Sequence, residues 1–76
     1  MITVKLYGLI RIESGIKEKQ LEANSVKEVL VSLQDCGIDP RYLKGCIILV
    51  NGKSVHKRTK LADGDTVVLM SPVAGG

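Results

Sequence analysis

Apolar residues occupy every second position from residue 2 to residue 6, and the residues between them are polar or amphipathic. A period of two is typical of a strand with one face on the core, so residues 2–7 are predicted to form the first strand. Gly8 ends it, and we expect residues 9–15 to form a loop or short turn packed by its apolar side chains. The alternation returns over residues 17–23, which predicts a second strand in a hairpin-like pair with the first.

A helical pattern follows. Ser25 and, three residues later, Glu28 form a capping box, in which each side chain accepts a hydrogen bond from a free backbone N–H. Gly37 ends the helix, because glycine most readily takes the left-handed conformation there. Asp39-Pro40 then opens a turn and a linking segment to Gly45. The apolar stripe that this helix turns toward the sheet consists of Val26, Val29, Leu30 and Leu33.

Two further apolar runs predict strands in the second half of the chain. Residues 46–50 are followed by Asn51-Gly52, which a tight type I′ turn prefers because both positions need positive φ. We therefore expect a hairpin that returns through residues 53–56. A turn at residues 63–65 precedes the last predicted strand, residues 66–70. Four consecutive apolar residues in this strand suit a central strand covered on both faces, or one whose outer face meets a partner.

The predicted order is β-β-α-β-β-β, an α+β fold with a mixed sheet of four to five strands and one main helix on one face. A single helical crossover between two hairpins places the first and last strands in parallel at the centre, by a right-handed connection. This is the ubiquitin-like β-grasp arrangement. We expect the β-grasp domain to span residues 1–70 and a flexible tail to span residues 71–76. The architecture alone does not name a function.

Composition and charge narrow the function classes. A chain of 76 residues allows one small domain and leaves little room for a deep catalytic cleft. The net charge is +3, and residues 41–60 hold six basic residues and no acidic one, which indicates an acidic partner or phosphate. Nucleic acid is disfavoured, because single-strand readers interleave aromatic residues with basic ones and only Tyr42 is available there.

Recognisable sites for other chemistry are lacking in the sequence. The longest uninterrupted apolar run, residues 47–50, is far shorter than a membrane span, so we expect a cytoplasmic protein with no membrane partner. His56 stands without metal-ligand spacing or a paired carboxylate, so we expect no metal site and no bound cofactor. Cys36 and Cys46 match no zinc or redox motif and are expected to be small core residues.

The sequence ends in Ser71-Pro-Val-Ala-Gly-Gly76. One explanation of the two terminal glycines is that the end of the chain is flexible. The alternative is chemical, because two residues without Cβ can thread a narrow channel and bring the terminal carboxylate close to a nucleotide phosphate. That carboxylate can attack the α-phosphorus of ATP to give an acyl-adenylate, from which a sulfur nucleophile displaces AMP. The product is a thiocarboxylate at Gly76. Pro72 favours an extended Ser71, so the tail is expected to project from the domain.

Several segments together resemble a known family. The sequence is similar to the ubiquitin-like sulfur carriers of the MoaD/ThiS type, most closely to the small subunit of molybdopterin synthase. Residues 72–76 are the most specific match and favour the molybdopterin branch over the thiamine branch. The other matching segments are residues 4–8, the helix capped by Ser25, residues 49–53 and residues 61–67.

The resemblance implies a carrier that is not an enzyme on its own. Gly76, preceded by Gly75, would be adenylated and converted to a thiocarboxylate by an E1-like enzyme of the MoeB/ThiF type, which uses ATP, and by a persulfide sulfur donor. The loaded tail would then enter the large subunit of molybdopterin synthase, of the MoaE type, and donate sulfur to cyclic pyranopterin monophosphate in molybdenum cofactor biosynthesis. The residues expected to dock on partners are Val68, Met70, Pro72, Val73 and Ala74.

Two other functions stay open. One is a sulfur carrier for thiamine or another sulfur-containing metabolite, which would form a thiocarboxylate without a stable large-subunit complex. The other is a ubiquitin-like protein modifier or plain binding module, and a modifier would become linked to other proteins through Gly76.

Overall fold

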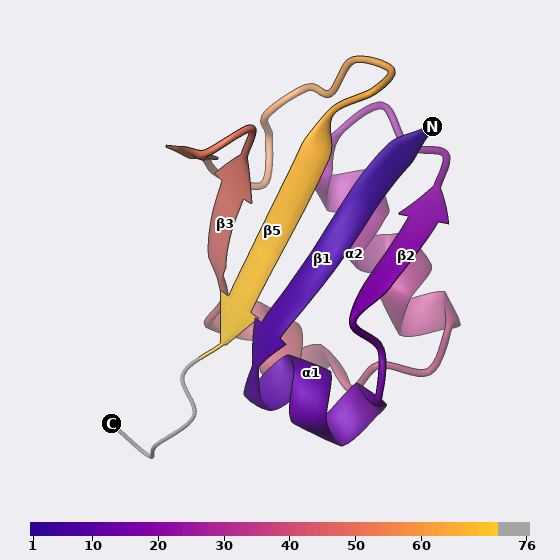
Figure 1. The fold of residues 1–76 in the computed structure, drawn as a ribbon, viewed down its shortest axis with the longest axis vertical. Helices are drawn as coiled ribbons and strands as arrows, with labels where there is room; N and C mark the ends of the chain where they lie inside the picture. Colours follow the sequence, from indigo (N-terminus) through magenta and orange to yellow (C-terminus); the bar gives the residue numbers. More distant parts are fainter. Residues whose placement is uncertain (72–76) are drawn as a thin grey trace.

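The computed structural model describes residues 1–71 of the chain. Its elements are, in chain order, β1 (Ile2–Gly8), α1 (Leu9–Ser14), β2 (Glu18–Leu21), α2 (Val26–Asp35), α3 (Pro40–Lys44), β3 (Ile47–Val50), β4 (Lys53–Ser54) and β5 (Thr66–Ser71). The strands form one mixed sheet in the order β2-β1-β5-β3-β4, and α2 lies behind the sheet in the view of Figure 1. The predicted α+β class, with one main helix on one face of a mixed sheet, is confirmed.

The first and last strands pair in parallel at the centre of the sheet, as predicted. Their register runs from Thr3 opposite Thr66 to Gly8 opposite Ser71. β2 joins the free edge of β1, and β3 joins the free edge of β5, both antiparallel. Strands from the two ends of the chain are therefore held together over six consecutive pairs.

The core between the sheet and α2 is aliphatic. Alternate residues of the two central strands point into it, as the period-two pattern predicted, and the stripe on α2 faces them. Burial of this apolar surface, at about 25 cal/mol per Å², is the main term that offsets the entropy of ordering so short a chain. The residues that no solvent reaches are Val4, Leu6, Ile10, Val26, Val29, Leu33, Val67 and Leu69.

The ends of α2 follow the sequence closely. Ser25 Oγ accepts a hydrogen bond from Glu28 N at 3.3 Å. The Glu28 carboxylate accepts one from Asn24 N at 3.0 Å, one residue earlier than the predicted capping box places it. Gly37, with φ of 100°, takes the left-handed conformation just beyond the helix. The predicted start and end of the helix are confirmed.

The loop predicted over residues 9–15 is wrong, because residues 9–14 form the helix α1. Ile10 anchors this helix in the core, and its backbone N–H donates to Ser71 Oγ at 2.7 Å. Gly15, with φ of 73°, ends the helix. The hydroxyl that accepts the hydrogen bond from the first turn of α1 belongs to a residue 61 positions away. The sequence around α1 therefore contains no capping residue that would predict the start of this helix.

Residues 40–44 were predicted to be part of an irregular linking segment, and this prediction was wrong, because they form the helix α3. Asp39 Oδ1 accepts a hydrogen bond from Arg41 N at 2.9 Å, and Pro40 occupies the first turn, where its missing N–H costs nothing. Cys36 is exposed, so its interpretation as a core residue was wrong, whereas Cys46 is half-buried.

All five strands differ in length from their predictions. β1 continues one residue further, through Gly8, and β3 begins one residue later, at Ile47. β2 covers only residues 18–21 of the predicted 17–23, and β4 covers only residues 53–54 of the predicted 53–56. β5 continues one residue further than predicted, through Ser71.

The hairpin turn between β3 and β4 is tied to the start of β5. Asn51 and Gly52 both have positive φ, at 50° and 86°, as predicted for this turn. The Asn51 side chain donates to Asp65 Oδ1 at 2.9 Å and accepts from Thr66 N at 3.0 Å. Asp65 Oδ2 also accepts from Ala62 N at 2.9 Å. The hydrogen bonds from Ala62 and then from Asn51 lower the pKa of Asp65 from its ordinary value of 3.8.

Replacing Asp65 by alanine should therefore cost stability in a pH-dependent way. A carboxyl group with a lowered pKa in the folded state stabilises the fold above its unfolded pKa, and this contribution is lost as the pH falls through the folded pKa. We expect the native protein to exceed Asp65→Ala in free energy of unfolding at about pH 5, and the difference to shrink toward about pH 2. Urea unfolding followed by circular dichroism measures it, and a difference that grows on acidification contradicts this role.

Candidate functional site: the outer sheet face and the end of β5

The face of the sheet opposite α2 carries apolar side chains that no described element covers. Met70 on β5 lies between Tyr7 on β1 and Ile47 on β3 in the strand register. All three are exposed: Ile47 keeps 53% of its surface accessible and Met70 39%. Val68 lies beside Leu49 in the next row, and both are half-buried.

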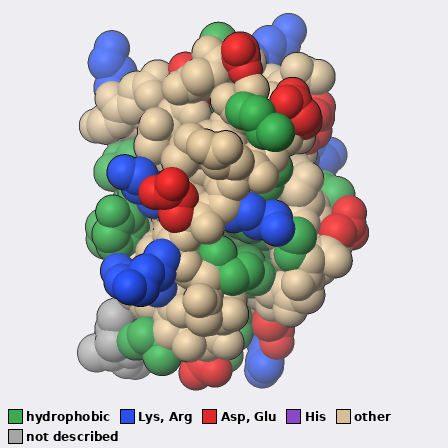
Figure 2. All heavy atoms as spheres, turned by 45° about the vertical axis from the view of Figure 1, so that its right-hand side comes forward, with side chains coloured by type: hydrophobic (Ala, Val, Ile, Leu, Met, Phe, Trp, Pro, Cys, Tyr) green, Lys and Arg blue, Asp and Glu red, His purple; other side chains and the backbone are tan. Residues whose placement is uncertain are grey.

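We call these five residues the outer-face patch. Contiguous exposed apolar side chains of this kind mark sites of protein interaction in soluble domains. Figure 2 shows one face of the molecule, on which basic and acidic side chains are interspersed with hydrophobic ones between them. Neither sign of charge dominates the face seen in this view.

The end of β5 is fixed where the outer-face patch ends. Ser71 is 5% exposed and is the buried polar side chain of the described residues. Its hydroxyl accepts from Ile10 N, and its backbone lies opposite Gly8 in the parallel ladder. A Cβ on residue 8 would overlap the carbonyl oxygen of Ser71, and Gly8 has φ of 77°. Only glycine permits this approach, which places the last described residue against the first turn of α1.

The structure places two of the residues predicted from the sequence. Met70 and Val68 lie on the outer face, next to each other along the direction of the tail. The other predicted site residues, Pro72, Val73, Ala74, Gly75 and Gly76, lie outside the described residues, and their roles stay predictions.

Three members of the patch were missed by the sequence reasoning. Tyr7, Ile47 and Leu49 come from strands distant in sequence, and only the register brings them beside Val68 and Met70. The sequence did contain one indication that Tyr7 lies on an apolar outer surface. It is an aromatic residue at a position of the alternating strand where a polar residue is expected.

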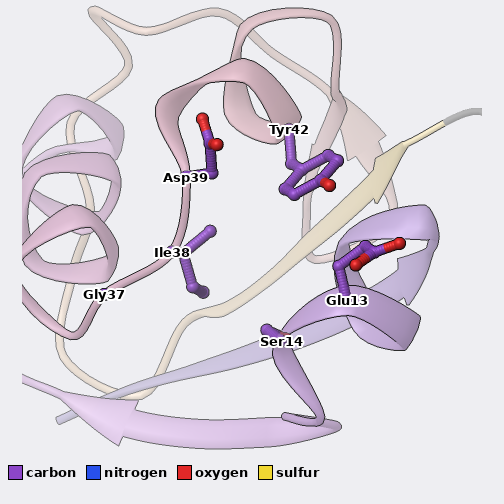
Figure 3. Close-up of a pocket in the computed structure, with 6 residues that line it drawn as sticks. All are labelled: Glu13, Ser14, Gly37, Ile38, Asp39 and Tyr42. Atoms are coloured by element: carbon purple, nitrogen blue, oxygen red, sulfur yellow. The ribbon is translucent and has the colours of Figure 1, made fainter.

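A shallow pocket of about 150 Å³ lies between α1 and α3 (Figure 3). Glu13 and Ser14 line it from α1, and Asp39 and Tyr42 from the α3 side. Arg41 Nη2 donates to Asp39 Oδ2 at 2.8 Å, and this hydrogen bond is the main cause that lowers the pKa of Asp39. Asp39 therefore stays ionised near neutral pH and is unsuited to act as a general acid.

The described residues meet neither the requirements of a metal site nor those of a membrane-spanning helix. Within residues 1–71, no three His, Cys, Asp or Glu side chains are grouped so that they could hold a metal ion. No helix among these residues is long and apolar enough to cross a membrane.

A family model and several solved structures match this chain. The model of the ThiS family matches residues 4–76. One similar structure is a complex of subunits 1 and 2 of molybdopterin-converting factor from Helicobacter pylori 26695, with 30% identity and a TM-score of 0.75 over 99% of this chain and 97% of that one. No curated protein matches significantly.

Two further solved structures share the fold. The small archaeal modifier protein 1 (SAMP1) of Methanosarcina acetivorans has 28% identity and a TM-score of 0.83, covering 99% of this chain and 95% of that one. A chain of the Amycolatopsis orientalis BexX/CysO complex matches over the full length of both chains, at 24% identity and a TM-score of 0.80. The predicted ubiquitin-like β-grasp fold is confirmed.

Replacing Gly8 by alanine should be among the most damaging single substitutions in this domain. The new Cβ meets the Ser71 backbone and forces a left-handed residue, so we expect a loss of about 3 kcal/mol or more in the free energy of unfolding. Gly15→Ala is the comparison variant, because Gly15 has nearly the same φ but nothing within 4 Å of its Cβ position. The two positions also differ in ψ, which is −148° at Gly8, a conformation almost restricted to glycine, and 5° at Gly15. Gly15→Ala should lose only about 1–2 kcal/mol. Equal losses in urea unfolding would show that the contact with Ser71 does not matter.

Proposed function

The chain belongs to the ThiS family of ubiquitin-like sulfur carriers, and we propose that it carries sulfur as a thiocarboxylate on Gly76 and donates it to cyclic pyranopterin monophosphate in molybdopterin biosynthesis. The observation that carries the proposal is the family match itself, which continues through the terminal Gly75-Gly76. The family assignment confirms the resemblance seen in the sequence. A carrier also accounts for the exposed apolar surface that the described residues provide.

The loading chemistry uses the main-chain carboxylate of Gly76. One carboxylate oxygen attacks the α-phosphorus of ATP and releases pyrophosphate, which leaves an acyl-adenylate. The terminal sulfur of a persulfide then displaces AMP, and a thiol cleaves the resulting S–S bond to leave the thiocarboxylate and a disulfide. The E1-like adenylating enzyme and the persulfide donor supply every catalytic group. The carrier supplies the reacting carboxylate and the surface by which it is held.

The outer-face patch is the surface we assign to docking. Met70 and Val68 stand at the end of the strand that leads into the tail, so a partner that covers them receives the tail at the same time. The Helicobacter pylori structure is a complex of subunits 1 and 2 of molybdopterin-converting factor, which supports a large-subunit partner here. In this arrangement the large subunit binds the pterin substrate and provides the acid and base residues.

A second candidate function is protein modification. The likeness to small archaeal modifier protein 1, at 28% identity, favours it. Both functions begin with adenylation of Gly76 and differ in the acceptor, a sulfur-receiving metabolite or a lysine amine. A carrier for thiamine or for another sulfur-containing metabolite differs from the first only in that acceptor. A stable complex with a large subunit distinguishes the molybdopterin function from the others.

Deleting Gly76, or adding one residue after it, should abolish sulfur transfer in an assay reconstituted with the adenylating enzyme, a persulfide donor and the large subunit. Both changes displace the reacting carboxylate and leave every residue of the described core unaltered, so the circular dichroism spectrum and the unfolding midpoint should stay unchanged. Full sulfur transfer by either variant would overturn the proposal.

Replacing Met70 by glutamate should weaken docking and leave the fold intact. A buried charge at an apolar contact should lower the affinity for the large subunit by roughly tenfold or more, about 1.4 kcal/mol. The free energy of unfolding should change by about 0.5 kcal/mol or less, since Met70 is exposed in the free protein.

Val31→Glu is the matched control. Val31 is similarly exposed, at 49%, but lies on α2. Calorimetry should give this variant the affinity of the native protein. If Met70→Glu lowers the free energy of unfolding but leaves the affinity for the large subunit unchanged, the patch is not part of the docking surface.

A further inference from the structure

A small groove lies between α2 and α3, on the helical side of the molecule. Its volume is about 180 Å³, and we call it the α2–α3 groove. Because α2 covers the sheet face opposite the outer-face patch (Figure 1), this groove and the patch lie on opposite sides of the sheet. The residues that line it are Leu30, Gln34, Pro40, Leu43, Lys44 and Lys57.

The floor of the groove is apolar. Leu30 and Leu43 are almost fully buried and present only a small part of their surface, while Pro40 is exposed at the side. Pockets for whole small-molecule ligands usually measure about 300–1,000 Å³. A volume of about 180 Å³ instead suits one side chain of a larger partner.

The rim of the groove is basic. Lys44 and Lys57 line it, and no acidic residue does. Lys27 does not line the groove, but its backbone N–H donates to Lys57 O at 3.0 Å, and it lies three residues before Leu30 on the same face of α2. Two lysines, from α3 and from a loop, therefore line the apolar floor, and a third lies nearby on α2.

These charges are not neutralised within the described part of the protein. The ion pairs among residues 1–71 involve the amino group of Met1 and the side chain of Arg41, and none involves these three lysines. Glu28, the nearest acidic residue along α2, accepts a hydrogen bond from the backbone of Asn24. The N-terminal end of the α2 dipole adds to the positive potential near Lys27.

We propose that the α2–α3 groove binds an acidic segment of a protein partner, with one apolar side chain of that segment over Leu30 and Leu43 and its carboxylates facing the lysines. Charge complementarity selects an anionic partner, and the apolar floor selects a peptide over a nucleic acid. Stacking of a nucleic-acid base needs an aromatic side chain, and none lines this groove. Tyr42, which precedes the groove residue Leu43 in the sequence, lines the pocket of Figure 3 instead. The proposal does not depend on the chemistry of Gly76.

The test uses a fluorescein-labelled peptide of aspartate and glutamate residues with one central leucine, titrated into the full-length chain. We expect saturable binding that weakens as salt is raised, with the amide resonances of Leu30, Leu43 and Lys57 shifting most in NMR spectra. The double variant Lys44→Glu/Lys57→Glu should bind roughly tenfold more weakly or worse. A peptide with serine in place of leucine should also bind more weakly.

The control is Lys17→Glu/Lys53→Glu, which has the same net charge and changes two exposed lysines elsewhere. It should bind within about twofold of the native protein, because binding depends on local charges. If the charge-reversed pair at the groove fails to fold, Lys44→Gln/Lys57→Gln replaces it, with a smaller loss expected.

Equal losses in the groove and control variants would overturn the proposal, because they would show that only net charge matters. A single-stranded oligonucleotide of equal charge that binds more tightly and shifts the same amides would overturn it in favour of a nucleic acid.

Discussion

The parallel pairing of β1 with β5 joins strands more than sixty residues apart, and the other features of this domain depend on it. Closing so long a loop costs chain entropy, which the two central strands offset by burying alternate side chains against α2. The pairing closes at Gly8 and Ser71, where the missing Cβ of glycine lets the two backbones meet. The same contact brings the Ser71 hydroxyl to Ile10 N and thereby completes the first turn of α1.

This pairing also gives the sheet two faces of different character. One face is sealed by α2 and holds a core without Phe or Trp. The other face keeps Tyr7, Ile47 and Met70 exposed in one row, although nothing in the core requires apolar residues there. The part of these side chains that stays exposed adds nothing to the stability of the isolated fold, so a binding role explains that exposed area better than stability does. The row ends beside Ser71, the residue that precedes the tail in the sequence. In the proposed function, this position couples docking on the sheet to delivery of the C-terminus.

How far the sequence predicts this structure depends on how local each signal is. The first strand, α2 with its cap at Ser25 and the turn at Asn51-Gly52 are each specified within a few residues, and each was predicted. α1 was missed, because its first turn is satisfied by Ser71 and not by a neighbour. α3 was missed although Asp39 and Pro40 are a local N-cap and first-turn pair. Most of the outer-face patch required the register between three strands, which alternation within each strand does not give. The chemistry assigned to Gly76 comes from the sequence and the family, since the structure describes residues 1–71.

The central claim is that the terminal carboxylate is the reacting group of a carrier, and that its folded domain provides the surface that partner proteins bind. The most direct measurement is the intact mass of the protein after incubation with ATP, an E1-like adenylating enzyme and a persulfide donor, followed by mass analysis of its peptides. The account predicts replacement of a single oxygen by sulfur, confined to the C-terminal peptide. An unchanged mass, in a mixture that converts an established carrier of the family, would contradict it.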